Sequence, residues 1–216
     1  DRDAVRTVPV EIRFLSPGVF TFEMHANPEV DGRESAVAYD EAAVATDVEP
    51  TVRVEEAVLV AETDELEMRV GLDEWSFTIR DADGNVRLRE QRSDENAKGC
   101  RRTDPLRVVE ESVNGWPYRV ARTGTAFELQ SDERIYGLGE KFTEFDKRGR
   151  EINAWITQPN GAETEAAYKN VPFYLSTAGY GLLVDTAQKT TFDFGRRSTV
   201  TTDIAVEDDS FRFFYF

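Results

Sequence analysis

Residues 66–90 read LEMRVGLDEWSFTIRDADGNVRLRE, and large apolar side chains recur along them at every second position. The alternating positions are Leu66, Met68, Val70 and Leu72, and then Trp75, Phe77 and Ile79. A period of two is typical of a β-strand with one buried face and one face in solvent. The turn sequence at residues 81–85 contains an Asp-Gly pair, which favours a tight hairpin. This stretch therefore predicts consecutive antiparallel strands.

The same alternation occurs at residues 8–14 and 20–24, and short strand-like segments continue through the C-terminal third of the chain. Many short strands separated by turn residues favour an antiparallel sandwich. A length of 216 residues suits one domain with a sizeable core. We therefore predict an all-β fold, a large antiparallel two-sheet β-sandwich that forms a single domain over residues 1–216. Residues 35–47 are alanine-rich and fit a helix or a loop equally well.

The charge balance excludes one class of partner. The chain carries 42 Asp and Glu against 26 Lys and Arg, a net charge of -16, and the acidic residues are scattered along it. Such a field repels phosphate backbones, so we expect no nucleic-acid partner. Excess carboxylates with few lysines resemble the surfaces of proteins from salt-adapted, halophilic organisms, in which ionic strength screens the self-repulsion. We interpret the acidic surface as solvated and not as a binding site.

The sequence contains no apolar run of eighteen residues and opens without the pattern of a signal peptide. We therefore expect a cytoplasmic protein with no membrane segment. The single cysteine, Cys100, has no second cysteine to pair with and no nearby histidine. We expect neither a metal nor another cofactor.

Residues 139–170, GEKFTEFDKRGREINAWITQPNGAETEAAYKN, interrupt the alternation with charged residues, a Pro-Asn-Gly turn and an isolated tryptophan, Trp155. Long loops inside compact domains are usually functional or disordered. We predict a long functional loop here. Two glycines where this loop begins, Gly137 and Gly139, predict a tight transition that needs positive φ or close backbone approach.

Several motifs in this region together resemble one family. They are IYGLGEKF at 135–142, Arg148-Gly149, Trp155, AAYKNVPFYLS at 166–176 and GYGLLVDT at 179–186. This set resembles the N-terminal β-sandwich domain of glycoside hydrolase family 31, the α-glucosidases and α-xylosidases. The run from Glu165 to Phe173 resembles the prokaryotic α-xylosidase branch. The resemblance implies a galactose mutarotase-like supersandwich.

The resemblance also implies that this sandwich is an accessory domain. In the family, a (β/α)8 barrel outside these residues carries both catalytic aspartates, so no catalytic residue is expected here and the chain alone is expected to be inactive. The implied partners are the barrel, an α-linked oligosaccharide or glycoside ending in xylose or glucose, and further copies of the full-length enzyme as a homo-oligomer.

The resemblance further implies that residues 139–170 form part of the rim of the substrate pocket. The substrate-binding residues implied are Trp155, Thr157, Gln158, Phe142 and Lys169. The family commonly has an Asn-x-Asp pattern after the tryptophan, whereas this chain has Ile-Thr-Gln. An amide donates to and accepts from a sugar hydroxyl without the charge-assisted strength of a carboxylate, which leaves the leaving-group preference open. Trp155 either stacks on a sugar or holds the loop down.

Some alternatives remain open at this level. Lys169 and Asn170 either anchor the long loop or face the barrel. A free-standing carbohydrate-binding or aldose-epimerase-like sandwich would use His25 for acid/base chemistry, although we interpret His25 as a solvent-exposed loop residue. We expect Asp193 to face solvent from a strand, and we expect Phe173 to pack in the core.

Overall fold

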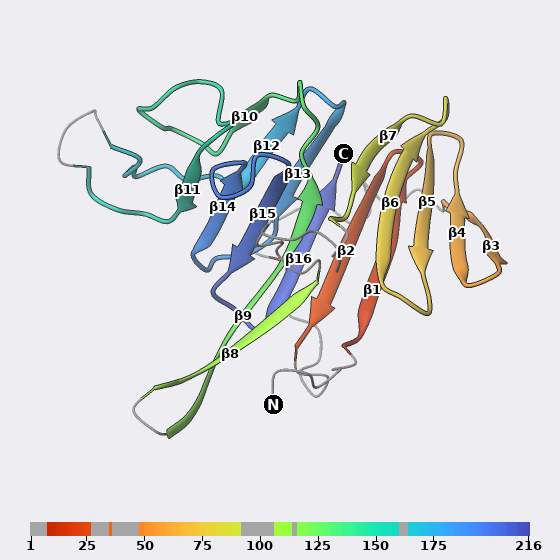
Figure 1. Ribbon diagram of the computed structural model, residues 1–216, viewed down its shortest axis with the longest axis horizontal. Coiled ribbons are helices and arrows are strands. Elements are labelled where there is room, and N and C mark those ends of the chain that lie inside the picture. The colour runs from red at the N-terminus through yellow and green to blue at the C-terminus, as the bar shows by residue number, and fades with distance from the viewer. Residues whose placement is uncertain (1–7, 27–34, 36–47, 92–105, 114–115, 160–163) are drawn as a thin grey trace.

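The computed structural model describes residues 8–26, 35, 48–91, 106–113, 116–159 and 164–216. This part of the chain forms sixteen β-strands and no helix (Figure 1). Every strand pair is antiparallel. The helix or loop anticipated at 35–47 lies almost entirely outside the described residues, and so does Cys100.

Hydrogen bonding divides the strands into three sheets. Sheet 1 contains, in spatial order, β1 (Val10–Ser16), β2 (Val19–His25), β16 (Ser210–Tyr215), β13 (Tyr180–Val184), β12 (Phe173–Ser176) and β10 (Ile135–Gly137). Sheet 2 contains β11 (Glu151–Ala154), β14 (Thr190–Phe194), β15 (Thr201–Val206), β9 (Trp116–Glu128) and β8 (Arg107–Val113). Sheet 3 contains β3 (Thr51–Glu55), β4 (Val58–Glu62), β5 (Leu66–Gly71), β6 (Ser76–Asp81) and β7 (Val86–Arg89).

The stretch from residue 66 to 90 forms the strands that its alternation predicts. Met68 lies opposite Ile79 and Val70 opposite Phe77, so the apolar residues of β5 and β6 share one face. The turn to β7 is held by Asp81, whose Oδ1 accepts the backbone N–H of Asn85 at 2.8 Å. Gly84 in the same turn has a φ of 82°, a conformation in which glycine has no steric cost.

Sheets 2 and 3 are joined where β7 ends beside β9. Glu90, just after β7, forms an isolated antiparallel bridge with Phe127 of β9. The backbone N–H of the next residue, Gln91, donates to the carbonyl of Ala126 at 2.8 Å. The edge of β9 is thus shared between β8 and the end of sheet 3, so sheets 2 and 3 continue each other.

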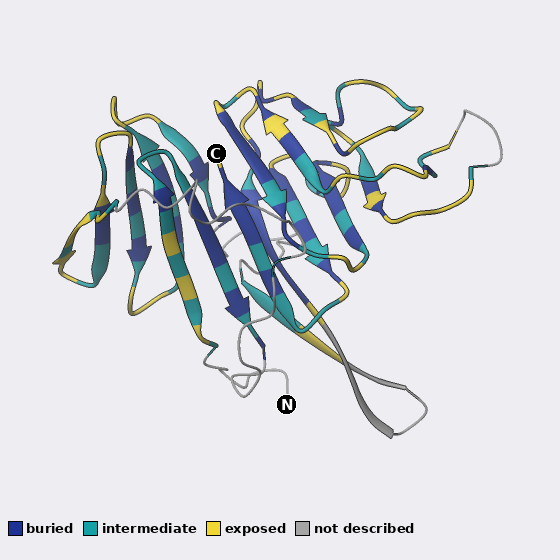
Figure 2. Ribbon diagram, turned by 180° about the vertical axis from the view of Figure 1, so that it is seen from behind, coloured by how far each residue is buried: buried dark blue, intermediate teal, exposed yellow. Residues whose placement is uncertain are grey.

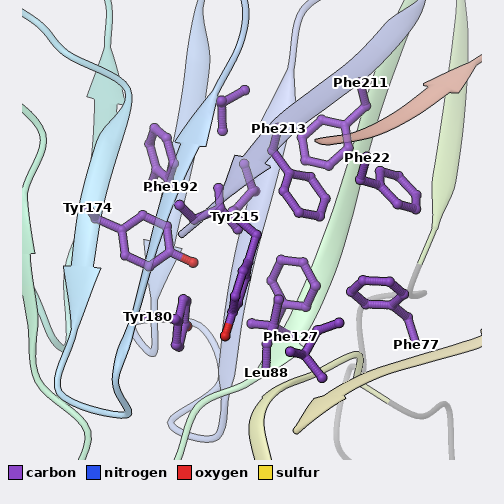
Figure 3. Close-up of a cluster of buried hydrophobic side chains, with 14 of the residues drawn as sticks. Phe22, Phe77, Leu88, Phe127, Tyr174, Tyr180, Phe192, Phe211, Phe213 and Tyr215 are labelled. Carbon is purple, nitrogen blue, oxygen red and sulfur yellow. The ribbon is translucent and has the colours of Figure 1, made fainter. Parts of the chain in front are cut away.

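Sheet 1 packs against both other sheets through aromatic side chains (Figure 3). Phe22 and Phe213 stack within sheet 1, with ring centroids 5.0 Å apart. Phe77 of sheet 3 meets Phe22 edge-on at 5.8 Å, and Phe127 of sheet 2 meets Phe213 edge-on at 6.1 Å. Offset and edge-to-face ring pairs stabilise cores beyond the area they bury. The all-β antiparallel sandwich is therefore confirmed. Its hydrogen bonds form three sheets where the sequence predicted two, and one sheet faces the other two.

Three predictions about single side chains are wrong. Asp193 lies in the interior of the fold and is 2% exposed. It can be buried because its carboxylate accepts hydrogen bonds from the backbone N–H groups of Arg196 and Arg197. Tyr174, at 0% exposure, is the core residue of β12, and its neighbour Phe173 lies on the other face, where its ring meets Phe216 at 6.0 Å. β12 therefore turns Tyr174 inward and Phe173 outward, the reverse of the predicted packing of Phe173 in the core.

His25 also differs from its prediction. It is the last residue of β2, and its side chain is only 16% exposed. Its Nε2 lies 2.8 Å from Oε1 of Glu23, and Nη1 of Arg212 lies 3.8 Å from the other oxygen of Glu23. Residues two apart on a strand point to the same side, so His25 is held beside Glu23 by the strand itself.

Candidate functional site: a clamped segment between two strands

The segment between β10 and β12 extends away from the sheets and carries β11 midway along it (Figure 1). The long loop predicted at 139–170 is therefore interrupted by a strand, because β11 pairs with β14 over four residues. The rest of the described segment has no regular strand and is largely exposed (Figure 2).

The segment begins with three successive residues at positive φ: Gly137 at 129°, Leu138 at 67° and Gly139 at 77°. A Cβ on Gly137 would lie 2.5 Å from the carbonyl oxygen of Phe173, and one on Gly139 would lie 2.4 Å from that of Lys169. Both glycines therefore have the positive φ and the close backbone approach that their spacing predicted. Leu138 also has a positive φ, which is a strained conformation for a residue other than glycine. Its side chain is fully buried, so the surrounding residues must stabilise this conformation.

Two side chains cross-link the segment where it leaves the sheets, and we call them the base clamp: Lys141 and Asn170. The ammonium of Lys141 donates to the carbonyl oxygens of Asn153 and Glu165, both at 3.0 Å, and to Oδ1 of Asn170 at 2.6 Å. The amide of Asn170 donates to the carbonyl oxygens of Trp155 at 2.9 Å and Ala167 at 2.8 Å. The clamp thus joins residues 153–155 to residues 165–170.

The backbone adds to this cross-link. Ile156 forms a parallel bridge with Ala167, and the backbone N–H of Thr157 donates to the carbonyl oxygen of Ala167 at 3.2 Å. Two limbs of the segment, residues 155–158 and 166–168, therefore lie side by side.

A group of charged side chains lies behind the clamp. Burial lowers the pKa of Lys141, and the nearby carboxylate of Glu165 opposes that shift. Burial also lowers the pKa of Lys147, again opposed by Glu165. Nη1 of Arg150 lies 3.9 Å from Oε1 of Glu165, and neither oxygen of Glu165 has a hydrogen-bond partner in the described part of the chain. Glu165 thus attracts Lys141, Lys147 and Arg150 mainly through its electrostatic field and less through direct hydrogen bonds.

The five residues predicted to bind substrate all lie on this segment and are exposed, but the structure does not bring them into one cluster. Trp155, Thr157 and Gln158 lie together on the first limb, and Trp155 is 47% exposed. Phe142, 49% exposed, follows the clamp lysine. The side chain of Lys169 is 80% exposed, with its ammonium 3.9 Å from Glu140.

The structure separates the two roles that the sequence left open for Lys169 and Asn170. Asn170 anchors the segment, whereas Lys169 does not take part in the clamp. Sequence reasoning missed Lys141, because a lysine in a charged loop is usually a solvated surface residue. Its position two residues after the strained glycine pair is the signal that could have identified it.

Large apolar side chains are unusually exposed on this segment and just beyond it. They are Phe142, Phe145, Trp155, Ile156, Tyr168 and Val171. A concentration of exposed large apolar side chains on one segment favours contact with a ligand or another domain. Aromatic rings and amide side chains together suit a sugar, which presents both apolar C–H faces and hydroxyl groups.

Other kinds of site receive no support within the described ranges. No group of three or more His, Cys, Asp or Glu side chains in those ranges is placed to hold a metal ion. No helix long and apolar enough to cross a membrane occurs there either.

Comparison with known proteins identifies relatives of this fold and segment. Residues 9–193 match the family model described as the glycosyl hydrolase 31 N-terminal galactose mutarotase-like domain. An alpha-xylosidase of Lactiplantibacillus pentosus is 42% identical over 83 residues, which are 38% of this chain and 11% of that protein. An alpha-xylosidase of Emericella nidulans is 35% identical over 96 residues, or 44% of this chain and 12% of that protein.

The fold has counterparts among solved structures. A family 31 dextranase of Flavobacterium johnsoniae, solved with glucose, aligns with a TM-score of 0.74 at 22% identity over 97% of this chain and 26% of that one. The matches thus span about a tenth of the length of the curated relatives and about a quarter of the solved chain.

Proposed function

Because the chain belongs to the glycosyl hydrolase 31 N-terminal galactose mutarotase-like domain family, we propose that it serves as the accessory sandwich of a retaining α-glycosidase. In this role it packs on a catalytic barrel and contributes residues 139–170 to the rim of the substrate pocket. The observation that carries the proposal is the base clamp, which holds an exposed, aromatic-rich segment away from the sheets.

The chemistry would lie outside this sandwich. A retaining glycosidase uses two carboxyl groups about 5–5.5 Å apart, one as nucleophile and one as acid/base. Two exposed carboxylates, those of Glu55 and Glu62, both form ion pairs with Arg53 on a strand face. The barrel would supply the catalytic pair, and the sandwich would supply binding contacts beyond the cleaved bond.

We propose terminal α-linked xylose as the substrate class, ahead of α-linked glucose. Two of the relatives at 35% identity or more carry the name alpha-xylosidase. The run from Glu165 to Phe173, which contains the clamp residue Asn170, resembles that branch. We further propose that the full-length enzyme is cytoplasmic and that it assembles into oligomers.

The test compares the full-length protein with residues 1–216 alone. We expect the full-length protein to release xylose from α-xylosides with retention at the anomeric carbon, as followed by NMR, and the isolated chain to release none. Hydrolysis by the isolated chain, or inversion by the full-length protein, would contradict the proposal. Light scattering of the full-length protein and fractionation of expressing cells test its oligomeric state and location.

The aldose-epimerase alternative is disfavoured by one contact. An epimerase needs its acid and base free to reach the sugar, whereas Nε2 of His25 is engaged by Glu23 at 2.8 Å. Accelerated mutarotation by the isolated chain, abolished by His25→Ala, would restore this alternative. Titration of the isolated chain with xylose and glucose should show negligible affinity.

A further inference from the structure

We propose that the free edge of β3 pairs with β3 of a second copy of this chain, antiparallel and centred on Val54, so that two copies of sheet 3 form one continuous sheet. This inference rests on the proposed assembly of the full-length enzyme into oligomers, and it names the surface through which two copies meet. The surface lies at the end of the molecule where sheet 3 ends in β3, away from residues 139–170 (Figure 1).

β3 is an edge strand without the protection that the other sheet edges carry. An open edge attracts further strands, and proteins usually protect it with a bulge or by keeping the edge strand very short. Within the described part of the chain, the edge strands β1, β7 and β8 each contain a register shift, and β10 and β11 have only three and four residues. β3 has five residues and pairs with β4 in unbroken register. It is therefore the edge best suited to accept another strand.

The backbone of β3 offers hydrogen-bonding groups to such a strand. A two-residue turn joins Glu55 to Val58, and the pair that closes such a turn lies at a hydrogen-bonded position of the ladder. Bonded and unbonded positions alternate along an antiparallel pair, so Val54 and Val52 direct their N–H and C=O groups to the free edge. Two copies of Val54 that face each other can therefore exchange two backbone hydrogen bonds.

The face of β3 that continues the hydrophobic core is exposed. Val52 lies opposite Ala61 of β4, and Val54 lies opposite Leu59. Ala61 is part of the core and Leu59 packs against it, yet Val52 is 57% exposed and Val54 is 60% exposed. The apolar face of sheet 3 thus extends into solvent by one strand. The valines of a second copy would cover it and remove apolar surface from water.

The charges on the other face of β3 favour a second copy as the partner. Nε of Arg53 lies 2.7 Å from Oε1 of Glu55, and the two side chains are 37% and 47% exposed, so both can reach a neighbouring strand. In antiparallel pairing centred on Val54, Arg53 of each copy lies opposite Glu55 of the other. Opposite charges directly across two strands are favourable, and the two-fold axis supplies this pair twice. The strand is thus complementary in charge to itself.

The net charge makes this association depend on salt. Each copy carries a charge of -16, so two copies repel each other in dilute solution. Salt screens this repulsion, whereas the contact between valines and the backbone hydrogen bonds persist in salt. We expect the two copies to associate more tightly in molar KCl than at low salt.

The experiment measures the mass of the full-length protein by sedimentation in molar KCl. Val54→Lys brings two lysines together across the axis and removes the contact between valines. We expect it to raise the dissociation constant of this interface about tenfold or more. Val200→Lys is the matched control, because Val200 is a valine of similar exposure, 58%, that lies outside sheet 3. This variant should leave the mass unchanged.

A second measurement tests the register. Val54→Cys should form a disulfide between copies under oxidising conditions, because a residue on the axis lies opposite itself. Cα atoms directly opposite at a hydrogen-bonded position are about 5.5 Å apart, within the span of a disulfide. Val52→Cys should not cross-link, since in this register it lies opposite Glu56 of the second copy. Val200→Cys controls for the other thiols of the protein.

Several results would overturn the inference. They are a full-length protein that is monomeric in molar KCl, a mass that Val54→Lys does not change, and a Val52→Cys variant that cross-links as readily as Val54→Cys. A lower melting temperature of Val54→Lys at unchanged mass would show that another part of the same polypeptide covers β3.

The failure of this inference is distinguishable from failure of the proposed function, because the readout is mass and not hydrolysis. An enzyme that releases xylose but associates through another surface overturns only the role of β3. A protein that hydrolyses neither α-xylosides nor α-glucosides overturns the proposed function, and its mass still decides whether β3 pairs.

Discussion

The ammonium of Lys141 donates a 2.6 Å hydrogen bond to Oδ1 of Asn170, twenty-nine residues further along the chain. Lys141 also bonds the carbonyl oxygens of Asn153 and Glu165, and Asn170 bonds the carbonyl oxygens of Trp155 and Ala167, one on each limb. A charge-assisted bond between partly buried groups is stronger than a neutral one. This pair therefore decides where the aromatic side chains of the segment are held.

Removing the clamp lysine should loosen the segment. Lys141→Met keeps an unbranched apolar stem but removes three hydrogen bonds, so we expect the free energy of unfolding to fall by about 1–3 kcal/mol. Hydrogen exchange at the amide of Thr157 should also accelerate. Lys169→Met, on the exposed lysine of the same segment, should stay within about 0.5 kcal/mol. Equal effects of the two variants would refute the clamp.

Replacing Gly139 should destabilise the fold much more than replacing Gly84, a glycine with a similar φ. Gly139 has a φ of 77° and a Cβ there would lie 2.4 Å from a backbone oxygen, whereas Gly84 has a φ of 82° and open space around it. Gly84→Ala should cost only the strain of the left-handed region, about 1 kcal/mol. Gly139→Ala should cost roughly 3 kcal/mol or more, because a backbone atom must move as well. Denaturant unfolding of both variants measures the difference.

Two buried tyrosines should respond oppositely to loss of their hydroxyl groups. The Tyr180 hydroxyl donates to Oε1 of Glu133 at 3.1 Å in the core, whereas the Tyr174 hydroxyl has no hydrogen-bond partner among the described residues. Tyr180→Phe leaves a buried carboxylate with one donor fewer and should cost about 1–3 kcal/mol. Tyr174→Phe should be neutral or stabilising by up to about 1 kcal/mol. A large loss of stability in Tyr174→Phe would show that its hydroxyl is bound, for example through an ordered water.

Glu90 should make the stability of the chain depend on pH. Burial raises the pKa of Glu90 from 4.5 to about 8, and the hydrogen bond that its Oε1 accepts from Thr125 opposes only part of that rise. Between these two pKa values the folded chain holds a proton that the unfolded chain has released. The free energy of unfolding should therefore fall as pH rises from about 4.5 to 8, and this contribution should be constant outside that window.

The test of this linkage is Glu90→Gln, which cannot ionise. The Glu90 contribution amounts to roughly 5 kcal/mol across the whole window. We expect the difference in free energy of unfolding between Glu90→Gln and the unchanged chain to grow with pH up to about 8 and then level off. Parallel pH profiles for the two proteins would show that Glu90 titrates normally.

Salt should stabilise this chain. The net charge of -16 produces self-repulsion, which ions screen. Ion pairs such as Arg53 with Glu55 and Glu62 weaken in salt, but exposed pairs contribute little. We expect the melting temperature to rise between 0.1 and 2 M KCl, as followed by circular dichroism. A melting temperature that falls with salt would contradict adaptation to high ionic strength.

The strands were accessible from sequence because their signal is local. The alternation of Met68 and Val70, and the Asp-Gly turn that follows β6, act within a few residues, so they predict strands and a hairpin without knowledge of the fold. The three-sheet arrangement was not accessible in this way. The way sheets 2 and 3 continue each other depends on the bridge of Glu90 with Phe127, between residues far apart in sequence.

Periodicity also leaves the direction of each face undecided. In β12 the alternation predicts that Phe173 and Tyr174 point to opposite sides, but both residues are large and apolar enough for the core. The neighbouring sheet decides, because Tyr174 meets Phe194 of β14 at 5.1 Å. Asp193 was misplaced for a related reason, since the backbone N–H groups that satisfy its carboxylate lie in a turn that periodicity does not describe.

By itself, the sequence determined an all-β sandwich, an exposed segment with Trp155 and two glycines at positive φ, because alternation, turn chemistry and backbone sterics act over a few residues. Tertiary structure alone decided that Lys141 and Asn170 hold the two limbs of that segment together and that Ile156 is bridged to Ala167. Hydrogen bonds between residues distant along the chain exist only after folding has brought their partners within reach.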